Sequence, residues 1–304
     1  MFKKEILCCL FCCLSIQDIF SLFNSGPKVL IVTSHPDDET TFPVTIYKIV
    51  HDLKGIADLA LMTDGQGGYR NTELASEYYG LNLRDSSIGR TYLPAIRKRE
   101  LMASGKIMGI RNFFFFDQVD DFYSQNPKPY EGGIKWDVPL IEKKLDQILS
   151  RTSYDYVLVL LPTADQHGHH KSSSLMALRA VKRLAGKNKP IVLGGLEMNK
   201  PELDSFSFKE LSGYPESKIN NAAPVFTFDR TARFGFMNLV SYMIVHDWTI
   251  AEYKSQGDTQ NNYINKFGIE AFWYFDLNDQ SGIAKVQKLF EQLKTSGFAT
   301  SKSR

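Results

Sequence analysis

Short apolar runs alternate with helical patterns along most of this chain, and this alternation limits the folds that it can adopt. The apolar runs have the length of strands and lie at residues 29–33, 56–62, 113–116, 156–161 and 191–196. Helical patterns lie between them, at about residues 39–53, 97–108, 138–150 and 172–185. Strands connected through helices pair in parallel, and they are apolar throughout because helices cover both faces of the sheet. The alternation therefore predicts an α/β fold, a three-layer sandwich around a mostly parallel sheet.

The other segments are less regular. Residues 65–94 and 123–133 are rich in glycine, proline and polar residues, and they lack a sustained period. We predict long loops there. From about residue 200 the order of elements changes. We predict a C-terminal extension with an extended run, a helix, a strand and a final helix, the first three at residues 225–228, about 232–255 and 270–275.

Size and charge restrict the class of protein. With 304 residues, of which 43% are hydrophobic, the chain can bury a large core. We predict one domain from residue 27 to residue 304. The net charge is +2, from 36 basic and 34 acidic residues, with no long block of like charge. A nucleic-acid binder needs a basic surface, so we expect a small molecule or a glycan as the partner instead.

The N-terminus has the pattern of an export signal. An apolar stretch at residues 6–16 follows Lys3 and Lys4, and it is too short to span a bilayer comfortably. We predict a signal peptide at residues 1–26, a periplasmic or extracellular protein, and no transmembrane span in the mature chain. No clean cleavage site is present. A retained apolar segment, in a cytoplasmic or membrane-associated protein, is therefore the alternative.

The cysteines lie in this same segment, as Cys8, Cys9, Cys12 and Cys13. The rest of the chain has no thiol. A disulfide framework and a cysteine nucleophile are therefore excluded from the body of the protein. Any metal site there must use histidine and carboxylate side chains.

Ionisable side chains follow the first strand directly. The segment SHPDDE occupies residues 34–39, beyond the carboxyl end of the run at residues 29–33, where α/β sheets bind ligands. Pro36 restricts the backbone of this turn, so His35 and Asp38 can point to one centre while Asp37 points elsewhere. A helix-capping turn is the structural alternative, since Asp is a good N-cap residue.

A second cluster, HGHH at residues 167–170, follows the strand-like run at residues 157–161. Histidine and aspartate together suit Zn²⁺, and a site with three protein ligands keeps a position open for water, as catalytic sites do. A solvated histidine-rich turn is the alternative. Since both clusters follow strands, together they favour a metal site.

The same residues resemble a known family. SHPDDE at residues 34–39, followed by His-x-x-His at residues 167–170, resembles the PIG-L/LmbE family of metal-dependent N-deacetylases, which act mainly on N-acetylglucosaminyl compounds. LMTDGQGG at residues 61–68 and RKREL at residues 97–101 are similar to two further family segments. The resemblance covers about residues 28–180 and implies a Rossmann-like sandwich. Toward the C-terminus only YKSQ resembles a family segment, His-x-Ser-Gln, with Tyr253 at the histidine position.

The resemblance also implies a role for each matching residue. His35, Asp38 and His170 would hold the metal, Zn²⁺ or another divalent ion such as Fe²⁺. Asp37 would be the general base that takes a proton from the attacking water. His167 would be a second catalytic residue, which stabilises the oxyanion or protonates the departing amine. The products would be acetate and a free amine.

The residue before the last histidine departs from the family pattern, in which it can orient the catalytic histidine. The family commonly has Asp just before the last histidine, and this chain has His169. We interpret His169 as a turn residue that faces solvent. Asp165 lies close enough in sequence to replace the missing carboxylate.

Two further residues are candidates for substrate binding. By resemblance, Arg97 would contact the sugar; an ion pair with Glu100 on a solvated helix face is the alternative. Asp120 follows the strand at residues 113–116 and could accept hydrogen bonds from sugar hydroxyls.

Other interpretations of the chain as a whole stay open. A related metal hydrolase could cleave a thiol conjugate or another amide that is not part of a sugar. A relative that has lost turnover could bind carbohydrate only. The run at residues 65–68 lacks the lysine of a phosphate-binding loop, so we interpret it as a loop beside the pocket.

Overall fold

The computed structural model describes residues 26–72, 74–186 and 189–296. Residues 1–25, which hold nearly all of the predicted signal peptide, lie outside the described residues. Within the described ranges, no helix combines the length and the apolar character needed to cross a membrane.

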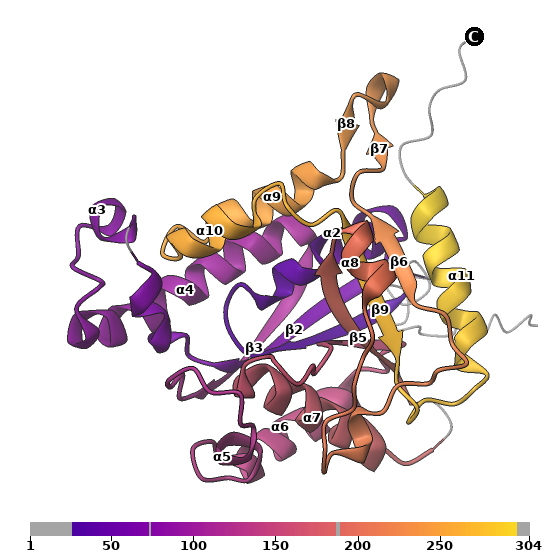
Figure 1. Ribbon diagram of the computed structural model, residues 1–304, viewed down its shortest axis with the longest axis horizontal. Coiled ribbons are helices and arrows are strands. Elements are labelled where there is room, and N and C mark those ends of the chain that lie inside the picture. Colours follow the sequence, from indigo (N-terminus) through magenta and orange to yellow (C-terminus); the bar gives the residue numbers. More distant parts are fainter. Residues whose placement is uncertain (1–25, 73, 187–188, 297–304) are drawn as a thin grey trace, which may run out of the picture.

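A seven-stranded sheet forms the centre of the molecule (Figure 1). The strands are β1 Lys28–Thr33, β2 Ile56–Thr63, β3 Ile110–Gln118, β4 Tyr156–Leu160, β5 Ile191–Met198, β6 Phe226–Asp229 and β9 Ile269–Tyr274. They lie in the order β3-β2-β1-β4-β5-β9-β6. All neighbours from β3 to β5 pair in parallel, and β9 is antiparallel to β5 and β6. The predicted α/β fold with a mostly parallel sheet is confirmed.

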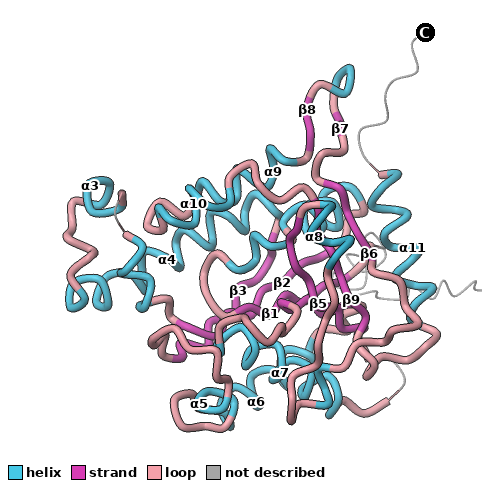
Figure 2. Tube along the Cα trace, viewed as in Figure 1, coloured by secondary structure: helices cyan, strands magenta, loops and turns pink. Residues whose placement is uncertain are grey.

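Helices cover both faces of the sheet (Figure 2). The α-helices are α2 Pro43–Tyr47, α3 Ala75–Tyr79, α4 Ser86–Met108, α5 Lys128–Glu131, α6 Val138–Arg151, α7 Gly168–Arg183, α8 Lys200–Ser205, α9 Met243–Ala251, α10 Gly257–Tyr263 and α11 Gly282–Thr295. Short turns of other helix types are η1 Asp38–Thr41, η2 Lys48–Asp52, η3 Gln66–Asn71, η4 Pro215–Ser217 and η5 Phe236–Asn238.

Two apolar cores lie between the sheet and these helices. One core joins the sheet to α2, α4, α9 and α11, and the other joins it to α6 and α7. Val29 and Ile31 of β1 belong to the first core, whereas Leu30 and Val32 belong to the second. Successive side chains of a strand point to opposite faces, so burial on both sides requires an uninterrupted apolar run.

The prediction of a loop at residues 65–94 is wrong for the C-terminal end of that range, where α4 begins. Asp85 caps this helix by accepting hydrogen bonds from the backbone N–H groups of Ser87 and Ile88 at 2.9 and 3.0 Å. Gly89 is a poor helix former, but a Cβ atom there would lie 2.4 Å from the Cβ of Tyr69. Close packing on the preceding segment therefore outweighs local helix propensity.

Two other helix predictions are wrong in part. The predicted helix at residues 39–53 is divided into η1, α2 and η2. The one at residues 232–255 is α-helical only in α9, because the chain first forms a projecting hairpin of β7 Arg233–Phe234 and β8 Val240–Ser241 (Figure 1). Gly235, Met237 and Asn238 have positive φ angles of 76°, 54° and 54°, which a right-handed helix does not allow. The other C-terminal predictions are confirmed as β6, β9 and α11.

A buried ion pair joins the C-terminal part of the chain to the segment after β1. Arg230 and Glu270 both have side chains that are 0% exposed, and their Nε and Oε1 atoms are 3.0 Å apart. The Glu270 carboxylate also accepts hydrogen bonds from the backbone N–H groups of Val44 and Thr45, both at 2.9 Å. Arg230 donates to the carbonyl oxygen of Thr41 at 2.6 Å. These contacts fix the start of α2 beneath the carboxyl edge of the sheet.

We predict that Glu270→Ala lowers the free energy of unfolding by about 3 kcal/mol or more, because it removes one of the two carboxylates that pair with the buried Arg230 and leaves the N–H groups of Val44 and Thr45 without their acceptor. Urea denaturation measures this change. Glu291→Ala, at an exposed position of α11, is the control and should change stability by less than about 0.5 kcal/mol. Equal stability of the two variants would contradict the assigned role of the ion pair.

Candidate active site

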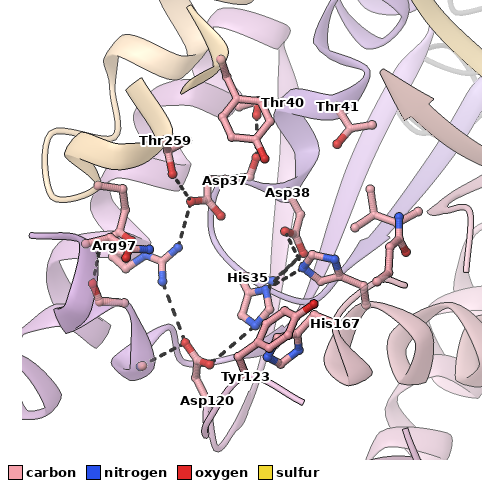
Figure 3. Close-up of a pocket in the computed structure, with 18 of the residues that line it drawn as sticks. His35, Asp37, Asp38, Thr40, Thr41, Arg97, Asp120, Tyr123, His167 and Thr259 are labelled. Carbon is pink, nitrogen blue, oxygen red and sulfur yellow. Dashed lines mark hydrogen bonds and ion pairs between the residues drawn. The ribbon is translucent and has the colours of Figure 1, made fainter. Parts of the chain in front are cut away.

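The predicted site residues meet at the carboxyl edge of the sheet (Figure 3). Residues 34–39 follow β1, Asp120 follows β3, and residues 167–170 lie between β4 and α7. Because β3, β2, β1 and β4 are parallel neighbours, the segments after them reach the same edge. All the predicted site residues line one cavity of about 690 Å³, namely His35, Asp37, Asp38, Arg97, Asp120, His167 and His170.

Three of these side chains, His35, Asp38 and His170, converge as a metal site requires, and we call them the metal group. Nδ1 of His35 lies 3.0 Å from Nε2 of His170 and 3.6 Å from Oδ2 of Asp38, and Nε2 of His170 lies 3.2 Å from Oδ1 of Asp38. A tetrahedral zinc ion spaces its ligand atoms by about 3.3 Å. The donor set and its spacing therefore fit a zinc-like divalent ion.

Backbone contacts hold the Asp38 carboxylate in place. Its Oδ2 accepts hydrogen bonds from the N–H groups of Ser34 and His35 at 2.9 and 2.8 Å. Burial lowers the pKa of His35, but Asp120 and Asp38 raise it by more, to about 10. The carboxylates thus favour positive charge at this point of the cavity, as the binding of a divalent cation requires.

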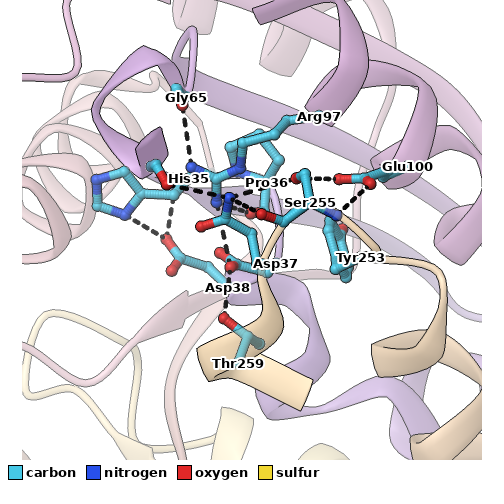
Figure 4. A network of polar contacts seen from close by, with 12 residues as sticks. His35, Pro36, Asp37, Asp38, Gly65, Arg97, Glu100, Tyr253, Ser255 and Thr259 are labelled. Carbon is cyan, nitrogen blue, oxygen red and sulfur yellow. Dashed lines mark hydrogen bonds and ion pairs between the residues drawn. The ribbon is translucent and has the colours of Figure 1, made fainter. Parts of the chain in front are cut away.

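Asp37 has surroundings different from those of Asp38 (Figure 4). Its backbone is left-handed, with φ 114° and ψ −22°. Its Oδ2 lies 3.1 Å from Nη2 of Arg97 and accepts a hydrogen bond from Oγ1 of Thr259 at 3.2 Å. Burial raises the pKa of Asp37, although Arg97 lowers it, and the result is about 6. The adjacent carboxylates thus face different partners, as the sequence predicts.

Arg97 is buried, which contradicts the alternative of an ion pair on a solvated helix face. The side chains of Arg97 and Glu100 both point inward, and the two residues are only 3% and 4% exposed. Arg97 donates from Nη1 to the carbonyl oxygen of Gly65 at 3.1 Å and from Nη2 to that of Pro36. It therefore fixes the backbone before Asp37 as well as the carboxylate itself. A contact with substrate stays a prediction.

A buried network behind Asp37 was missed by the sequence analysis (Figure 4). Glu39 is 0% exposed; its Oε2 accepts a hydrogen bond from the N–H of Asp37 at 3.1 Å, and its Oε1 accepts from Oγ of Ser104 at 2.8 Å and from the Tyr253 hydroxyl. Burial raises the pKa of Glu39 to about 7. Glu100 accepts from the N–H of Ser255 at 2.7 Å. The SHPDDE and YKSQ segments are the sequence signals that mark this contact.

Asp120 contacts the histidine rings and the loop after β2. Its Oδ2 accepts a hydrogen bond from the N–H of Gly67 at 3.0 Å, and its Oδ1 lies 3.6 Å from both Nε2 of His35 and Nδ1 of His169. Burial alone would raise the pKa of Asp120, but His35 and Arg97 lower this pKa by a larger amount, so the group stays ionised. These contacts position His35. The role of Asp120 in sugar binding stays a prediction.

The prediction that His169 faces solvent is wrong. The residue is 0% exposed. Its Nδ1 lies 2.9 Å from Nε2 of His35, and its ring packs against those of Tyr130 and Trp136 at centroid distances of 4.2 and 5.3 Å. It lies in the first turn of α7 on the face turned toward the core, which a short motif does not reveal. His169 therefore contacts the nitrogen of His35 that does not face Asp38 and His170, where metal sites place an orienting partner.

His167 is oriented by the backbone. It is the N-cap residue of α7, and its Nδ1 accepts a hydrogen bond from the N–H of His169 at 2.9 Å. The ring also packs edge-on against Tyr123, with a centroid distance of 4.9 Å. Burial, the larger cause, and His35 lower the pKa of His167 to about 3. The carboxylate of Asp165 accepts instead from Thr163 at 2.6 Å in an exposed turn, so Asp165 does not replace the missing family carboxylate.

The C-terminal part of the chain completes the cavity, and the sequence analysis assigned no role to these residues. The C-terminal residues that line it are Gln256, Thr259, Tyr263 and Phe267. Leu196 and Glu197, at the end of β5, also line it. Apart from Gln256, which ends the YKSQ segment, these residues carry no motif, so only the packing of the chain identifies them.

The chain is similar to known deacetylases. The family model described as PIG-L, GlcNAc-PI de-N-acetylase, matches residues 30–181. A probable N-acetyl-alpha-D-glucosaminyl L-malate deacetylase 2 of Bacillus cereus is 26% identical over 167 residues, which cover 54% of this chain and 65% of the relative. The chain thus spans just under two thirds of that relative's length.

Deacetylases are among the solved structures of similar proteins. The N,N'-diacetylchitobiose deacetylase from Pyrococcus horikoshii is 22% identical, with a TM-score of 0.38 over 55% of this chain and 58% of that one. A deacetylase of the teicoplanin biosynthetic pathway is 15% identical, with a TM-score of 0.49 over 84% of this chain and 99% of that one.

We predict that Asp120→Asn weakens zinc binding by about tenfold or more, because it removes the carboxylate that faces His35 from the side opposite the metal group. Competition with a chromophoric chelator measures the dissociation constant. Asp121→Asn is the matched control, since Asp121 pairs with Lys135 at 2.8 Å away from the histidines. Unchanged affinity in Asp120→Asn would show that Asp120 does not position the metal ligand.

Proposed function

The chain belongs to the PIG-L family, and on this basis we propose that it is a metal-dependent deacetylase. It would hydrolyse the amide of an N-acetylglucosaminyl-type substrate to acetate and a free amine. The observation that carries the proposal is the convergence of His35, Asp38 and His170 beside a second carboxylate, Asp37, in one cavity.

The proposed cofactor is Zn²⁺, with another divalent ion such as Fe²⁺ as the alternative. His35, Asp38 and His170 would hold it, because two imidazoles and one carboxylate suit zinc and leave a coordination position open. When bound, the ion would polarise the amide carbonyl and lower the pKa of water.

Asp37 is the proposed general base. Arg97 and Thr259 both contact Oδ2, and since no described residue is bonded to Oδ1, that oxygen would accept a proton from the attacking water. With a pKa of about 6, the carboxylate is ionised at neutral pH and is close to the pKa that suits proton transfer there. Asp37 is not one of the three converging ligand side chains but lines the same cavity, so it can act on water there while Asp38 faces His35 and His170.

His167 is the proposed oxyanion-stabilising residue. Since its Nδ1 accepts a backbone hydrogen bond, the neutral ring carries its proton on Nε2. That N–H can donate to the carbonyl oxygen as negative charge develops there. The assigned tautomer thus favours oxyanion stabilisation over protonation of the departing amine, the other role that the family resemblance implies, and the proton that Asp37 has taken from water is the one passed to the amine.

The proposed substrate carries an N-acetyl group on a sugar. The matching family model and the Bacillus relative are both named for N-acetylglucosaminyl compounds. Arg97 and Asp120 are the proposed contacts for its polar substituents, because both line the cavity. A nearly neutral chain supports a glycan over a nucleic acid as the partner.

We predict that the zinc-loaded protein releases acetate from N-acetylglucosaminyl compounds and that a chelator abolishes the release, because the water loses its activation. A coupled acetate assay on a panel of N-acetyl sugars measures this, and added Zn²⁺ should restore the rate after chelation. If the loaded protein cleaved only amides that are not part of sugars, the sugar assignment would be wrong.

We predict that Asp37→Asn lowers kcat by about 10²-fold or more, because an amide cannot accept the proton. Metal content, measured by mass spectrometry, should stay at the wild-type level, since Asp37 does not belong to the metal group. Asp165→Asn is the control and should keep wild-type turnover. Wild-type turnover in Asp37→Asn would exclude Asp37 as the base, and a chain that binds sugars without any measurable rate would be a carbohydrate-binding relative.

A further inference from the structure

The projecting hairpin of β7 and β8 ends in exposed apolar side chains (Figure 1). The two strands are antiparallel, and η5 connects them. Four large apolar side chains at this end are 84%, 71%, 66% and 42% exposed, namely those of Phe236, Met237, Leu239 and Val240. In the part of the chain that the structure describes, none of the four belongs to an apolar core. We call these four residues the hairpin tip.

The base of the hairpin is fixed to the body of the molecule. The rings of Phe234 and Tyr242 stack with a centroid distance of 4.2 Å. Tyr242 is only 5% exposed, and its N–H donates a hydrogen bond to the carbonyl oxygen of Ala232 at 3.0 Å. Its hydroxyl accepts a hydrogen bond from Nζ of Lys48 at 2.8 Å. The hairpin tip therefore projects from a well-packed support.

The turn at the end of the hairpin has an unfavourable backbone. Met237 and Asn238 both have a φ angle of 54°, which is costly for residues other than glycine. Burial does not offset this cost at Met237, which is 71% exposed. The N–H of Asn238 donates to the carbonyl oxygen of Gly235 at 3.1 Å, and that of Leu239 donates to the carbonyl oxygen of Phe236 at 3.3 Å. The turn thus satisfies two of its own backbone donors, as backbone that enters lipid must.

The hairpin and the nearby end of the chain carry positive charge. Between residues 231 and 245 the only charged residue is Arg233, which is exposed. The chain just after α11 lies beside the hairpin, because the carbonyl oxygen of Ser296 accepts a hydrogen bond at 2.7 Å from the same Lys48 ammonium group that contacts Tyr242.

The residues at this end of the chain add to the positive charge. From residue 292 onward the chain has no acidic side chain, and its cations are Lys294, Lys302 and Arg304. Of these, only Lys294 lies within the described residues, and it is exposed. A partner that contacts the hairpin tip is therefore expected to carry negative charge.

The size and shape of the hairpin tip favour a lipid surface over a protein partner. Four side chains of this size present on the order of 600 Å² of apolar surface at most, which is less than the roughly 800 Å² that each partner of a stable protein interface buries. A projecting tip also needs a matching pocket in a protein, whereas the fluid interface of a bilayer adapts to its shape. Apolar side chains with cations beside them are the combination that binds anionic bilayers.

We propose that the hairpin tip inserts into the surface of an anionic lipid bilayer, with Arg233 and Lys294 facing the lipid headgroups. The apolar side chains of the tip enter the boundary between headgroups and acyl chains, to a depth of about 5–10 Å. The chain thus docks on one side of the membrane. This proposal is independent of the deacetylase function.

Vesicle flotation tests the apolar part of the proposal. The full chain should float with vesicles made of equal parts of phosphatidylcholine and phosphatidylserine. The double variant Phe236→Ser, Leu239→Ser should bind these vesicles about tenfold more weakly or less, because two large apolar side chains no longer enter the bilayer. Thermal unfolding should show that this variant is folded, since neither side chain belongs to a core.

Ile134→Ser is the matched control. Ile134 is 77% exposed after α5, where Tyr130 and Trp136 belong to the second core, whereas Phe234 and Tyr242 at the hairpin base pack in the first core on the other face of the sheet. Since Ile134 lies away from the hairpin, this variant should bind the vesicles like the wild type.

The charged part has its own test. Arg233→Gln and Lys294→Gln should each weaken binding to the anionic vesicles about fivefold, as expected for one cation near an anionic lipid surface. Neither variant should change binding to vesicles of phosphatidylcholine alone. Lys143→Gln, at an exposed position of α6, is the control and should bind both kinds of vesicle like the wild type.

A fluorescence measurement reports on the hairpin alone, which matters because the apolar segment at residues 6–16 can itself bind lipid. A tryptophan introduced by Phe236→Trp should be quenched by vesicles that contain brominated phosphatidylcholine and phosphatidylserine. The wild-type chain gives the background from its three native tryptophans. Ile134→Trp is the matched control, and its added fluorescence should not be quenched.

Three results would each overturn the proposal. The first is wild-type affinity of the Phe236→Ser, Leu239→Ser variant for anionic vesicles, and the second is equal quenching at positions 236 and 134. The third is a dimer in the absence of lipid that dissociates in the double variant, measured by sedimentation velocity. In that case the hairpin tip would be an interface between two copies of the chain.

Discussion

The guanidinium of Arg230 connects parts of the chain that are far apart in sequence, and the shape of the site depends on it. It contacts the carboxylates of Glu270 and Glu197 and the carbonyl oxygen of Thr41, which lies just after the SHPDDE segment. Removing such charges from water is unfavourable, and the arrangement is stable because nearly every donor and acceptor has a partner. The same side chain thus anchors the start of α2, strand β9 and one wall of the cavity. This buried cation is the reason that a C-terminal part without a clear motif belongs to the site.

Much of the sheet could be predicted from the chain because burial on two faces leaves a strong pattern. Val29, Leu30, Ile31 and Val32 must all be apolar when alternate side chains enter different cores. The position of the site followed from the same pattern, because polar clusters that follow parallel strands reach one edge. Short motifs then identified the side chains that converge there. Local signals were sufficient where each element is constrained by its own sequence.

Other features depend on contacts that a local pattern does not contain. The first turns of α4 are stable through packing of Gly89 on Tyr69, although glycine disfavours a helix. The interior position of His169 depends on how α7 faces Tyr130 and Trp136. Glu39 and Tyr253 are separated by most of the chain, and only folding brings them together. The position of Glu197 likewise depends on distant contacts, because its partner Arg230 follows β6 and its neighbour His246 belongs to α9.

The left-handed backbone at Asp37 has a consequence for how this chain can vary. A φ of 114° is unfavourable for every residue with a side chain, and glycine would relieve it. Selection for robustness alone would therefore replace the aspartate, and the hydrogen bond from its N–H to Glu39 would still form. A chain that keeps aspartate here has a less stable fold than one with glycine, but it retains a carboxylate at this position of the cavity. Retention of this residue in distant variants would thus indicate that selection acts on chemistry and not on durability.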